Sequence, residues 1–231
     1  MDYTISGGPS TITATTAGVI SGTPVNADVG AHTITVTCTD GSNAAATDEY
    51  VLTVTNTNDA PTVASAISDV SAAEDAAYSL DISSVFTDMD VGDSLSYTIS
   101  GAPSTITHTS GTISGTPVNA DVGTHTIVVT ATDSSSAAAT VTDTYVLTVT
   151  NTNDAPTVAS AISDVSAAED TAYSLDASGT CTDVDASDSM DYTISGGPST
   201  ITATTAGVIS GTPVNADVGA HTITVTCTDG S

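Results

Sequence analysis

Internal repetition is the feature that most constrains the fold of this chain. The octapeptide N-T-N-D-A-P-T-V occurs at 56–63 and again at 151–158, and residues 1–42 are identical to residues 190–231. A variant of the same segment lies between them. A fixed spacing of this kind indicates an array of similar structural units. We therefore predict a partial unit at 1–59, a complete unit at 60–154, and a unit at 155–231 that lacks its last strand.

The complete unit alternates apolar and polar residues with a period of two, which is typical of half-buried β-strands. We expect an edge strand near 62–70, a strand from 78 to 86, an acidic turn at 87–93 and a strand at 95–99. Short strands follow near 105–109 and 112–114, and longer ones at 125–132 and 144–150. In the first unit, the same pattern predicts strands at 32–39 and 50–55.

About seven short strands in one unit, without any helical stretch, predict an all-β fold of tandem immunoglobulin-like β-sandwich repeats of about 95 residues. A seven-stranded barrel is the structural alternative. Met1 aligns with Met190, an internal position, so we expect the chain to be a window on a longer array. The incomplete end units would then be continued in the same chain, with strand addition from another chain as the alternative.

The charge of the chain excludes several classes of partner. It has no Lys or Arg, and its 27 acidic residues include only three Glu, for a formal charge of −27. Such a chain cannot hold nucleic acid through phosphate contacts, and it is repelled by an anionic membrane surface. No run of about 20 apolar residues occurs, so we expect no membrane insertion. Adaptation to high salt is an alternative explanation for the acidity, although more Glu would then be expected.

The acidic residues recur in sets at expected strand ends. In the complete unit, Asp88, Asp90 and Asp133 fall at one pole, while Glu74, Asp75 and Asp121 fall at the other. Ca²⁺ binds six to eight oxygen atoms from carboxylates, amides and carbonyls, so converging loops of this kind suit it. The third unit repeats the sets, with these members: Asp183, Asp185, Asp229, Glu169, Asp170 and Asp217. A single Asp, such as Asp69 or Asp164, is better explained as a solvated turn residue.

Together these motifs resemble cadherin-type repeats. The resemblance rests on Glu74, the turn Thr87-Asp88-Met89-Asp90-Val91-Gly92, Ala131-Thr132-Asp133 and the linker Asn151-Thr152-Asn153-Asp154-Ala155-Pro156. The run Gly111-Thr112-Ile113-Ser114-Gly115-Thr116-Pro117 resembles the dystroglycan-type and bacterial Ig-like variants of that group. The resemblance implies Ig-like sandwiches, Ca²⁺ at each junction between repeats, and a stiff rod.

The resemblance also implies two sets of metal ligands. At the first junction they would be Asp28, Asn56, Asn58, Asp59, Asp88, Asp90 and Asp133. At the second they would be Glu74, Asp75, Asp121, Asn151, Asn153, Asp154, Asp183, Asp185 and Asp229. Asn58 and Asn153 would offer backbone carbonyls. Cadherins usually have Asp where Asn56 and Asn151 stand, and a second acid in the Asn-Ala-Asp loop, so we expect one to three ions per junction.

Alignment of the repeats also bears on the cysteines. Cys38 and Cys227 align with Ala131, and Cys181 aligns with Phe86, so Cys181 and Cys227 belong to one unit at core-facing positions. A disulfide between them would stabilise the unit by about 3–4 kcal/mol and would imply an oxidising compartment. Two buried thiols are the alternative.

These observations predict a structural, Ca²⁺-stiffened segment of an extracellular or cell-surface stalk, adhesin or filament. Its partners would be neighbouring repeats of the same chain or identical chains. The alternatives are an adhesion module that binds a glycan or a protein, and a spacer in a larger secreted enzyme. An enzymatic role is not expected, because His32, His125 and His221 occupy the same strand position in each copy and no nucleophile or phosphate-binding motif occurs.

Overall fold

The structure, a computed structural model, is all-β, as predicted. It describes residues 1–90, 92–135, 138–185 and 188–230, so Val91 of the acidic turn lies outside the described part. Contacts divide the chain into two compact units. Unit 1 comprises Met1–Val70, Ser79–Gly115 and His125–Leu147, and unit 2 comprises Ser71–Tyr78, Thr116–Thr124 and Thr148–Ser231.

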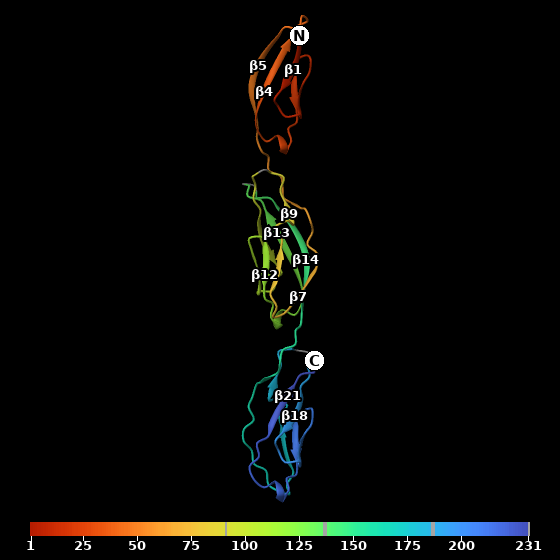
Figure 1. The fold of residues 1–231 in the computed structure, drawn as a ribbon, viewed down its shortest axis with the longest axis vertical. Coiled ribbons are helices and arrows are strands. Elements are labelled where there is room, and N and C mark those ends of the chain that lie inside the picture. The colour runs from red at the N-terminus through yellow and green to blue at the C-terminus, as the bar shows by residue number, and fades with distance from the viewer. Residues whose placement is uncertain (91, 136–137, 186–187, 231) are drawn as a thin grey trace. The chain divides into compact units, whose positions relative to one another are not determined.

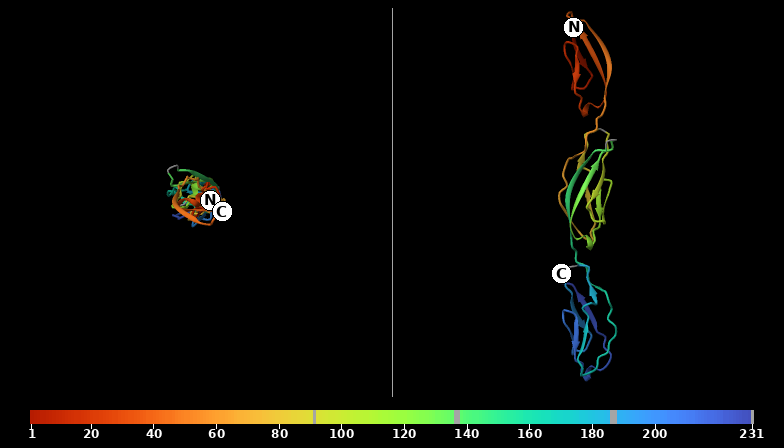
Figure 2. Two further views of the ribbon diagram at one scale, coloured as in Figure 1. Left: turned by 90° about the horizontal axis from the view of Figure 1, so that it is seen from above. Right: turned by 180° about the vertical axis from the view of Figure 1, so that it is seen from behind.

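The first repeat holds five strands and a single turn of 3₁₀ helix, η1 (Asn26–Asp28). In Figure 1, β1, β4 and β5 lie side by side in one antiparallel sheet, while β2 and β3 form a separate hairpin. These strands, red to orange, remain grouped in the rear view of Figure 2. Their bounds are β1 Asp2–Ser6, β2 Ile12–Ala14, β3 Ile20–Gly22, β4 Gly30–Thr39 and β5 Ala45–Val54.

The middle repeat forms one sheet in the order β10-β13-β14-β7, a second in the order β11-β12-β8, and a short ladder of β6 with β9. Two main sheets are the arrangement of a sandwich rather than of a closed barrel. A 3₁₀ turn, η2 (Asn119–Asp121), precedes β13. The strand bounds are β6 Thr62–Val63, β7 Val70–Ala73, β8 Tyr78–Asp81, β9 Phe86–Thr87, β10 Ser96–Ser100, β11 Ile106–Thr109, β12 Thr112–Gly115, β13 Gly123–Thr132 and β14 Thr140–Thr150.

The third repeat forms the ladders β15-β17 and β18-β21 and the three-stranded sheet β16-β20-β19. Its 3₁₀ turn is η3 (Asn215–Asp217). The strand bounds are β15 Thr157–Val158, β16 Tyr173–Asp176, β17 Cys181–Thr182, β18 Asp191–Ser195, β19 Ile201–Ala203, β20 Val208–Gly211 and β21 Thr224–Thr228.

Two expected strands of the middle repeat are interrupted. The edge strand expected at 62–70 is present only as β6 and the start of β7. The strand expected from 78 to 86 ends at Asp81, where the Asp81 carboxylate accepts a hydrogen bond from the Ser83 N–H at 2.9 Å. A turn then follows, because the Val85 N–H donates to the carbonyl of Ile82 at 3.1 Å. A local polar contact therefore ends the strand after Asp81, against the apolar alternation of the sequence.

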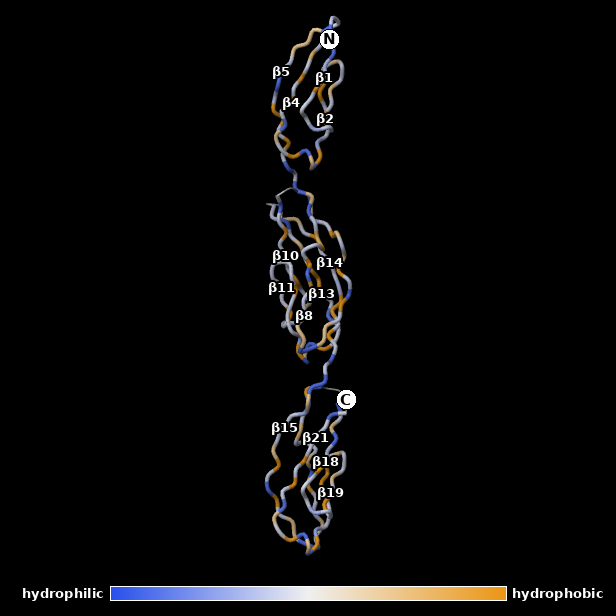
Figure 3. The backbone as a smooth tube through the Cα atoms, in the orientation of Figure 1, coloured by the Kyte–Doolittle hydropathy of each residue, from blue (hydrophilic) through white to orange (hydrophobic). Residues whose placement is uncertain are grey.

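The core of the middle repeat lies between its sheets. Along β14, Tyr145, Leu147 and Val149 are only 1%, 0% and 2% exposed to solvent. Ile127 and Val129 of β13 are fully buried. Figure 3 shows the underlying alternation as short changes between hydrophobic and hydrophilic positions along the strands. The first repeat covers its last strand less well, since Tyr50 of β5, which aligns with Tyr145, is 41% exposed.

Candidate metal centre

Three carboxylates meet in the acidic turn that follows β9. Asp88, Asp90 and Asp93 each place one carboxylate oxygen within 4.8 Å of the others. The Asp90 side chain is only 5% exposed, and the Asp90 N–H donates to Asp88 Oδ1 at 2.9 Å. The chain thus folds back on itself over the turn and concentrates negative charge in a small, partly buried space.

The linker and η1 of unit 1 also reach this turn. The Asp59 N–H donates to Asp90 Oδ2 at 2.7 Å. The Asn26 amide group donates to Asp59 Oδ2 at 2.8 Å and to Asp90 Oδ1 at 3.4 Å. Three segments far apart in the sequence therefore converge on Asp90, which is the geometry that a polydentate cation site needs.

Asp133, at the end of β13, lies beside the linker. The Asn58 amide group donates to Asp133 Oδ2 at 3.0 Å, and the N–H and hydroxyl of Ser135 donate to Oδ1 at 3.1 and 2.7 Å. These bonds hold the pKa of Asp133 below its ordinary value. The bond from Asn58 lowers the pKa most, and the bond from the Ser135 hydroxyl is the next largest cause. The carboxylate is 4% exposed and remains charged at neutral pH.

Unit 2 repeats the arrangement after β17. The Asp185 N–H donates to Asp183 Oδ1 at 2.9 Å, and the Asp154 N–H donates to Asp185 Oδ2 at 2.7 Å. The Asn119 amide group donates to Asp185 Oδ1 at 2.7 Å, and that of Asn153 donates to Asp229 Oδ2 at 3.2 Å. Asp185 is 3% exposed. The second centre thus reproduces the main contacts of the first: the linker N–H and the amide of the 3₁₀ turn both donate to the central Asp.

Glu74 adds a buried carboxylate to the second centre. It is 1% exposed, and its Oε1 accepts a hydrogen bond from the Thr152 N–H at 2.9 Å. The Thr152 hydroxyl also donates to the Glu74 carbonyl at 3.3 Å. Asp75 follows in a left-handed conformation, with φ 57°, and its N–H donates to the Pro117 carbonyl at 2.9 Å. This end of the middle repeat is therefore tied to the linker that leaves it.

Repulsion between these carboxylates shows in the pKa of Asp154. Burial raises this pKa above its ordinary value, and the charges of Asp75, Asp185 and Asp183 raise it further. A raised carboxyl pKa means that the ionised form is disfavoured in the folded state. This group therefore lowers stability at neutral pH, and the penalty disappears as the pH falls through the folded pKa. A bound cation would relieve the same repulsion without a change of pH.

Six buried side-chain oxygens of the two centres have no hydrogen-bond partner among the described residues. At the first centre they are Asn58 Oδ1, Asp88 Oδ2 and Asp93 Oδ2, and at the second they are Glu74 Oε2, Asp183 Oδ2 and Asp188 Oδ2. An unsatisfied buried polar group is costly, and a charged one more so. All six are oxygens, five of them from carboxylates, so the donor set fits a hard divalent cation such as Ca²⁺.

Some of the expected ligands are engaged elsewhere. Asp28 Oδ2 accepts hydrogen bonds from the Thr11 hydroxyl at 2.6 Å and from the Val25 N–H at 3.0 Å, and Asp121 Oδ2 accepts one from the Val118 N–H at 3.0 Å. These carboxylates therefore close the 3₁₀ turns η1 and η2. Asn56 and Asn151 are exposed, as are Glu169 and Asp170 of the third repeat.

Four residues of the centres were not among the expected ligands. They are Asp93 and its repeat equivalent Asp188, which lie in the acidic turns, and Asn26 and its equivalent Asn119, whose amides reach Asp90 and Asp185. The signal was recurrence, because each pair occupies the same position in successive repeats. Asp93 lies outside the motif that carries the resemblance, and Asn26 stands beside a more conspicuous acid, Asp28.

Thr11→Val is expected to raise the pKa of Asp28. The Thr11 hydrogen bond is the largest cause of the low pKa of Asp28, followed by the Val25 N–H. A lowered pKa contributes stability above the unfolded value of about 3.9, and this contribution is lost as the pH falls through the folded pKa. Carboxyl NMR titration measures the change. Thr13→Val is the control, since its hydroxyl contacts only the Ser21 carbonyl, at 3.5 Å, and it should leave Asp28 unchanged.

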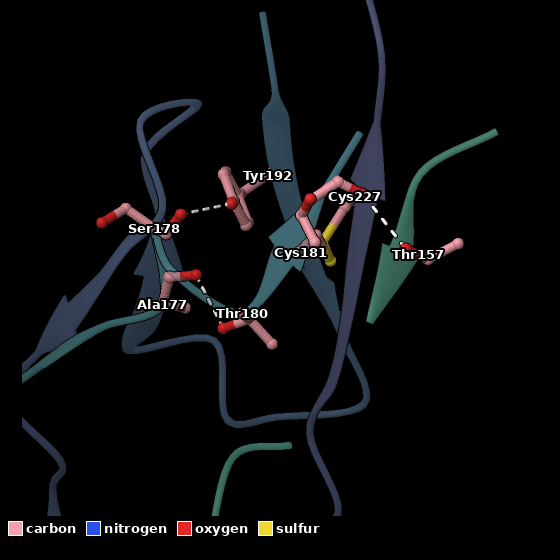
Figure 4. Close-up of a disulfide and its surroundings, with 8 residues drawn as sticks. Thr157, Ala177, Ser178, Thr180, Cys181, Tyr192 and Cys227 are labelled. Atoms are coloured by element: carbon pink, nitrogen blue, oxygen red, sulfur yellow. Dashed lines mark hydrogen bonds between the residues drawn. A yellow bond between two sulfur atoms is a disulfide. The ribbon is translucent and has the colours of Figure 1, made fainter. Parts of the chain in front are cut away.

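A disulfide joins Cys181 of β17 to Cys227 of β21, with 6.5 Å between their Cα atoms (Figure 4). Nearby, the Tyr192 hydroxyl donates to the Ser178 carbonyl at 2.6 Å and the Thr180 hydroxyl donates to the Ala177 carbonyl at 2.7 Å. Cys38 of the first repeat has a free thiol. The disulfide therefore fastens β21 to the strand that leads into the acidic turn of the third repeat.

Known structures share this architecture. Human CDH23 EC21-23 superposes with a TM-score of 0.60 over 92% of this chain and 79% of that structure, at 17% identity. Mouse Cadherin-23 EC22-24 superposes with a TM-score of 0.57 over 99% of this chain and 81% of that structure, at 18% identity. Protocadherin Gamma C5 EC1-3 superposes with a TM-score of 0.56 over 98% of this chain and 88% of that structure, at 16% identity. These likenesses show a fold of tandem Ig-like, cadherin-like sandwiches.

Curated relatives include the "Serine-rich adhesin for platelets" of Staphylococcus aureus strains MRSA252 and MSSA476. Each is 36% identical over 155 residues, which is 65% of this chain but only 11% and 6% of the relatives. The chain therefore spans about a tenth or less of their length. Among the described residues, no helix has the length and apolar character that crossing a membrane requires. The family model described as "Putative Ig domain" matches residues 1–55, 60–150 and 155–231, and the chain belongs to this family.

Proposed function

We propose that the two centres bind Ca²⁺ and that the bound ions stiffen the junctions between Ig-like repeats. The observation that carries this proposal is the set of six buried oxygens without a hydrogen-bond partner, three at each centre. The chain has no Lys or Arg side chain to neutralise them. Ca²⁺ would supply positive charge and a flexible coordination shell of six to eight oxygens.

At the first centre, Asp88, Asp90 and Asp93 would hold the ion, with Asn58 Oδ1 as a neutral ligand. Asp59 is held close by the bond from its N–H to Asp90, so the linker would be drawn to the acidic turn. At the second centre, the corresponding groups are Asp183, Asp185 and Asp188, with Glu74, Asp75 and Asp154 nearby. The linker residues would lose conformational freedom when the ion is bound, which is the physical content of stiffening.

We propose a mechanical rather than a catalytic role for the segment. The recurring histidines serve the fold: His32 Nε2 lies 2.6 Å from the Asp28 carbonyl, and His221 Nε2 lies 2.8 Å from the Asp217 carbonyl. Each ring thus tethers the segment that follows a 3₁₀ turn to that turn. Similarity to a staphylococcal adhesin and to cadherin ectodomain repeats supports a place in an extracellular or cell-surface stalk, adhesin or filament. The disulfide agrees with an oxidising compartment.

Calorimetric titration of the chelator-treated chain with CaCl₂ tests the proposal. We expect binding at both centres with dissociation constants of about 10⁻⁴–10⁻³ M or tighter, the range of extracellular Ca²⁺ modules. Asp90→Asn should weaken the first centre and Asp185→Asn the second, each by at least about tenfold, because each removes one of the buried charges. Asp191→Asn, an exposed residue of β18, is the matched control and should bind like the wild type. Undiminished binding by the double variant would refute these sites.

A further inference from the structure

The disulfide of the third repeat joins two strands that each lead directly into the second metal centre. Cys181 stands two residues before Asp183, and Cys227 stands two residues before Asp229. Cys181 belongs to β17, which precedes the acidic turn, and Cys227 belongs to β21. One covalent bond therefore links the two strands that carry these carboxylates (Figure 4).

The linker of the second centre is attached to the same strand. β15 begins three residues after Asp154 and pairs with β17, so that Val158 lies opposite Cys181 and Thr157 lies opposite Thr182. The Thr157 hydroxyl also donates to the Thr182 carbonyl at 3.3 Å. The linker and the acidic turn are thus held together by a β-ladder, and the disulfide holds the strand of the acidic turn to β21.

No ladder among the described residues joins β17 to β21. β17 pairs with β15, and β21 pairs with β18. At the centre itself, the hydrogen bond of 3.2 Å from the Asn153 amide group to Asp229 Oδ2 connects the end of β21 with the linker. The position of Asp229 relative to the acidic turn therefore depends on this weak contact, on side-chain packing and on the disulfide.

The middle repeat builds the first centre without a covalent bond. Phe86 and Ala131 occupy the positions of the two cysteines, and each stands two residues before an aspartate of the first centre. They are 5% and 0% exposed, and the ring of Phe86 packs against that of Tyr97 with 5.8 Å between the ring centroids. The chain therefore contains two similar centres, one held by packing and the other by a disulfide.

We propose that Cys181 and Cys227 are positioning residues of the second centre, and that their disulfide makes its affinity for Ca²⁺ depend on redox state. This inference rests on the proposal that the centres bind Ca²⁺. Carboxylates from separate segments repel one another, so holding them together before the ion arrives removes part of the cost of binding. When the bond is reduced, β17 and β21 can move apart, and the ion must then order them as it binds.

The coupling must act in both directions. If the disulfide raises the affinity for Ca²⁺ by some factor, bound Ca²⁺ favours the disulfide over the two thiols by the same factor, and such factors are typically about 5–150. Dithiothreitol is a suitable reductant for the test. The S–S bond breaks, each Sγ takes up one proton, and the two electrons come from dithiothreitol, which closes to its cyclic disulfide.

Titration of the oxidised and the reduced chain with CaCl₂ measures the effect on affinity. The Cys38→Ser background removes the third thiol, so that no other disulfide can form. Asp90→Asn in this background reports the second centre, and Asp185→Asn reports the first. Reduction should weaken binding at the second centre at least about fivefold and leave the first centre unchanged. Equal affinity of the oxidised and reduced second centre overturns the proposal.

A packed substitute separates positioning from folding. Cys181→Phe combined with Cys227→Ala gives the third repeat the pair that the middle repeat uses, and hydrogen exchange along β20 checks that this variant and the reduced chain remain folded. The second centre of the variant should bind Ca²⁺ at least about fivefold more weakly than the oxidised chain, and dithiothreitol should not change this affinity. Affinity equal to that of the oxidised chain would assign the effect of reduction to unfolding and overturn the proposal.

The thiol–disulfide equilibrium gives a readout that does not depend on measuring bound ions. At a fixed ratio of reduced to oxidised dithiothreitol, Ca²⁺ should raise the ratio of disulfide to dithiol chain at least about fivefold. Asp185→Asn should abolish this rise, and Asp90→Asn should retain it. No rise while both centres bind Ca²⁺ overturns the coupling alone. Absence of Ca²⁺ binding at both centres refutes the proposed function, and this inference with it.

Discussion

Removal of Ca²⁺ should lower the melting temperature of this chain by about 10 °C or more. A ligand that binds only the folded state stabilises it by about 2.7 kcal/mol when its free concentration is about 100 times the dissociation constant. For a domain of about 100 residues, each 1 kcal/mol corresponds to about 4–8 °C. Scanning calorimetry in calcium and then in chelator measures the shift. The transitions of the repeats are fitted separately, because an array need not unfold in one step.

The variants divide this effect between the centres. Asp90→Asn should remove most of the calcium-dependent rise in melting temperature of the unit that holds the first centre. Asp185→Asn should remove most of that rise for the unit that holds the second centre. In chelator, each variant should be as stable as the wild type or more stable, because it removes a buried charge that has no counter-ion. Asp191→Asn should keep the full shift. Raising NaCl to the same ionic strength is the second control, since screening alone would stabilise all of these proteins equally. A shift of the same size in NaCl would contradict specific binding.

Loss of the disulfide should destabilise the third repeat by about 4 kcal/mol. The bond closes a loop with a sequence separation of 46, and the entropy of closing a loop of this length in the unfolded chain corresponds to about 4 kcal/mol. The double variant Cys181→Ser, Cys227→Ser removes the bond without leaving a lone thiol. Urea unfolding followed by a probe in the third repeat measures the loss, and reduction of the wild type should reproduce it.

The first repeat provides the control for the disulfide. Cys38 has the same neighbours in sequence as Cys227, but its thiol is free, so Cys38→Ser should change stability little. In the middle repeat, Phe86 and Ala131 occupy the two aligned positions and are 5% and 0% exposed. The transition of that repeat should not respond to reductant. A loss below about 1 kcal/mol in the double variant would show that the loop-closure argument overstates the effect here.

Much of the candidate site could be predicted from the sequence because its parts recur. Asp88, Asp90 and Asp133 were expected at one end of the middle repeat, and the structure brings the linker residues Asn58 and Asp59 to them. Asn26 was not expected, and the structure gives a local reason. The 3₁₀ turn η1 directs Asp28 back to Thr11 and Val25, and it directs the Asn26 amide toward Asp59 and Asp90. The geometry of this turn therefore decides that Asn26, and not Asp28, faces the first centre.

By itself, the sequence determined the repeats, the all-β class and the faces of the strands, because alternation of apolar residues is a local property. It did not determine where strands form. Gly30–Thr39 and Gly219–Thr228 are identical, yet one is strand throughout and the other only from Thr224. Val70–Ala73 and Val165–Ala168 differ in the same way. The hydrogen bonds of a β-strand are made to another segment, so only the tertiary structure, through the presence of that partner, decides whether a strand-forming sequence becomes a strand.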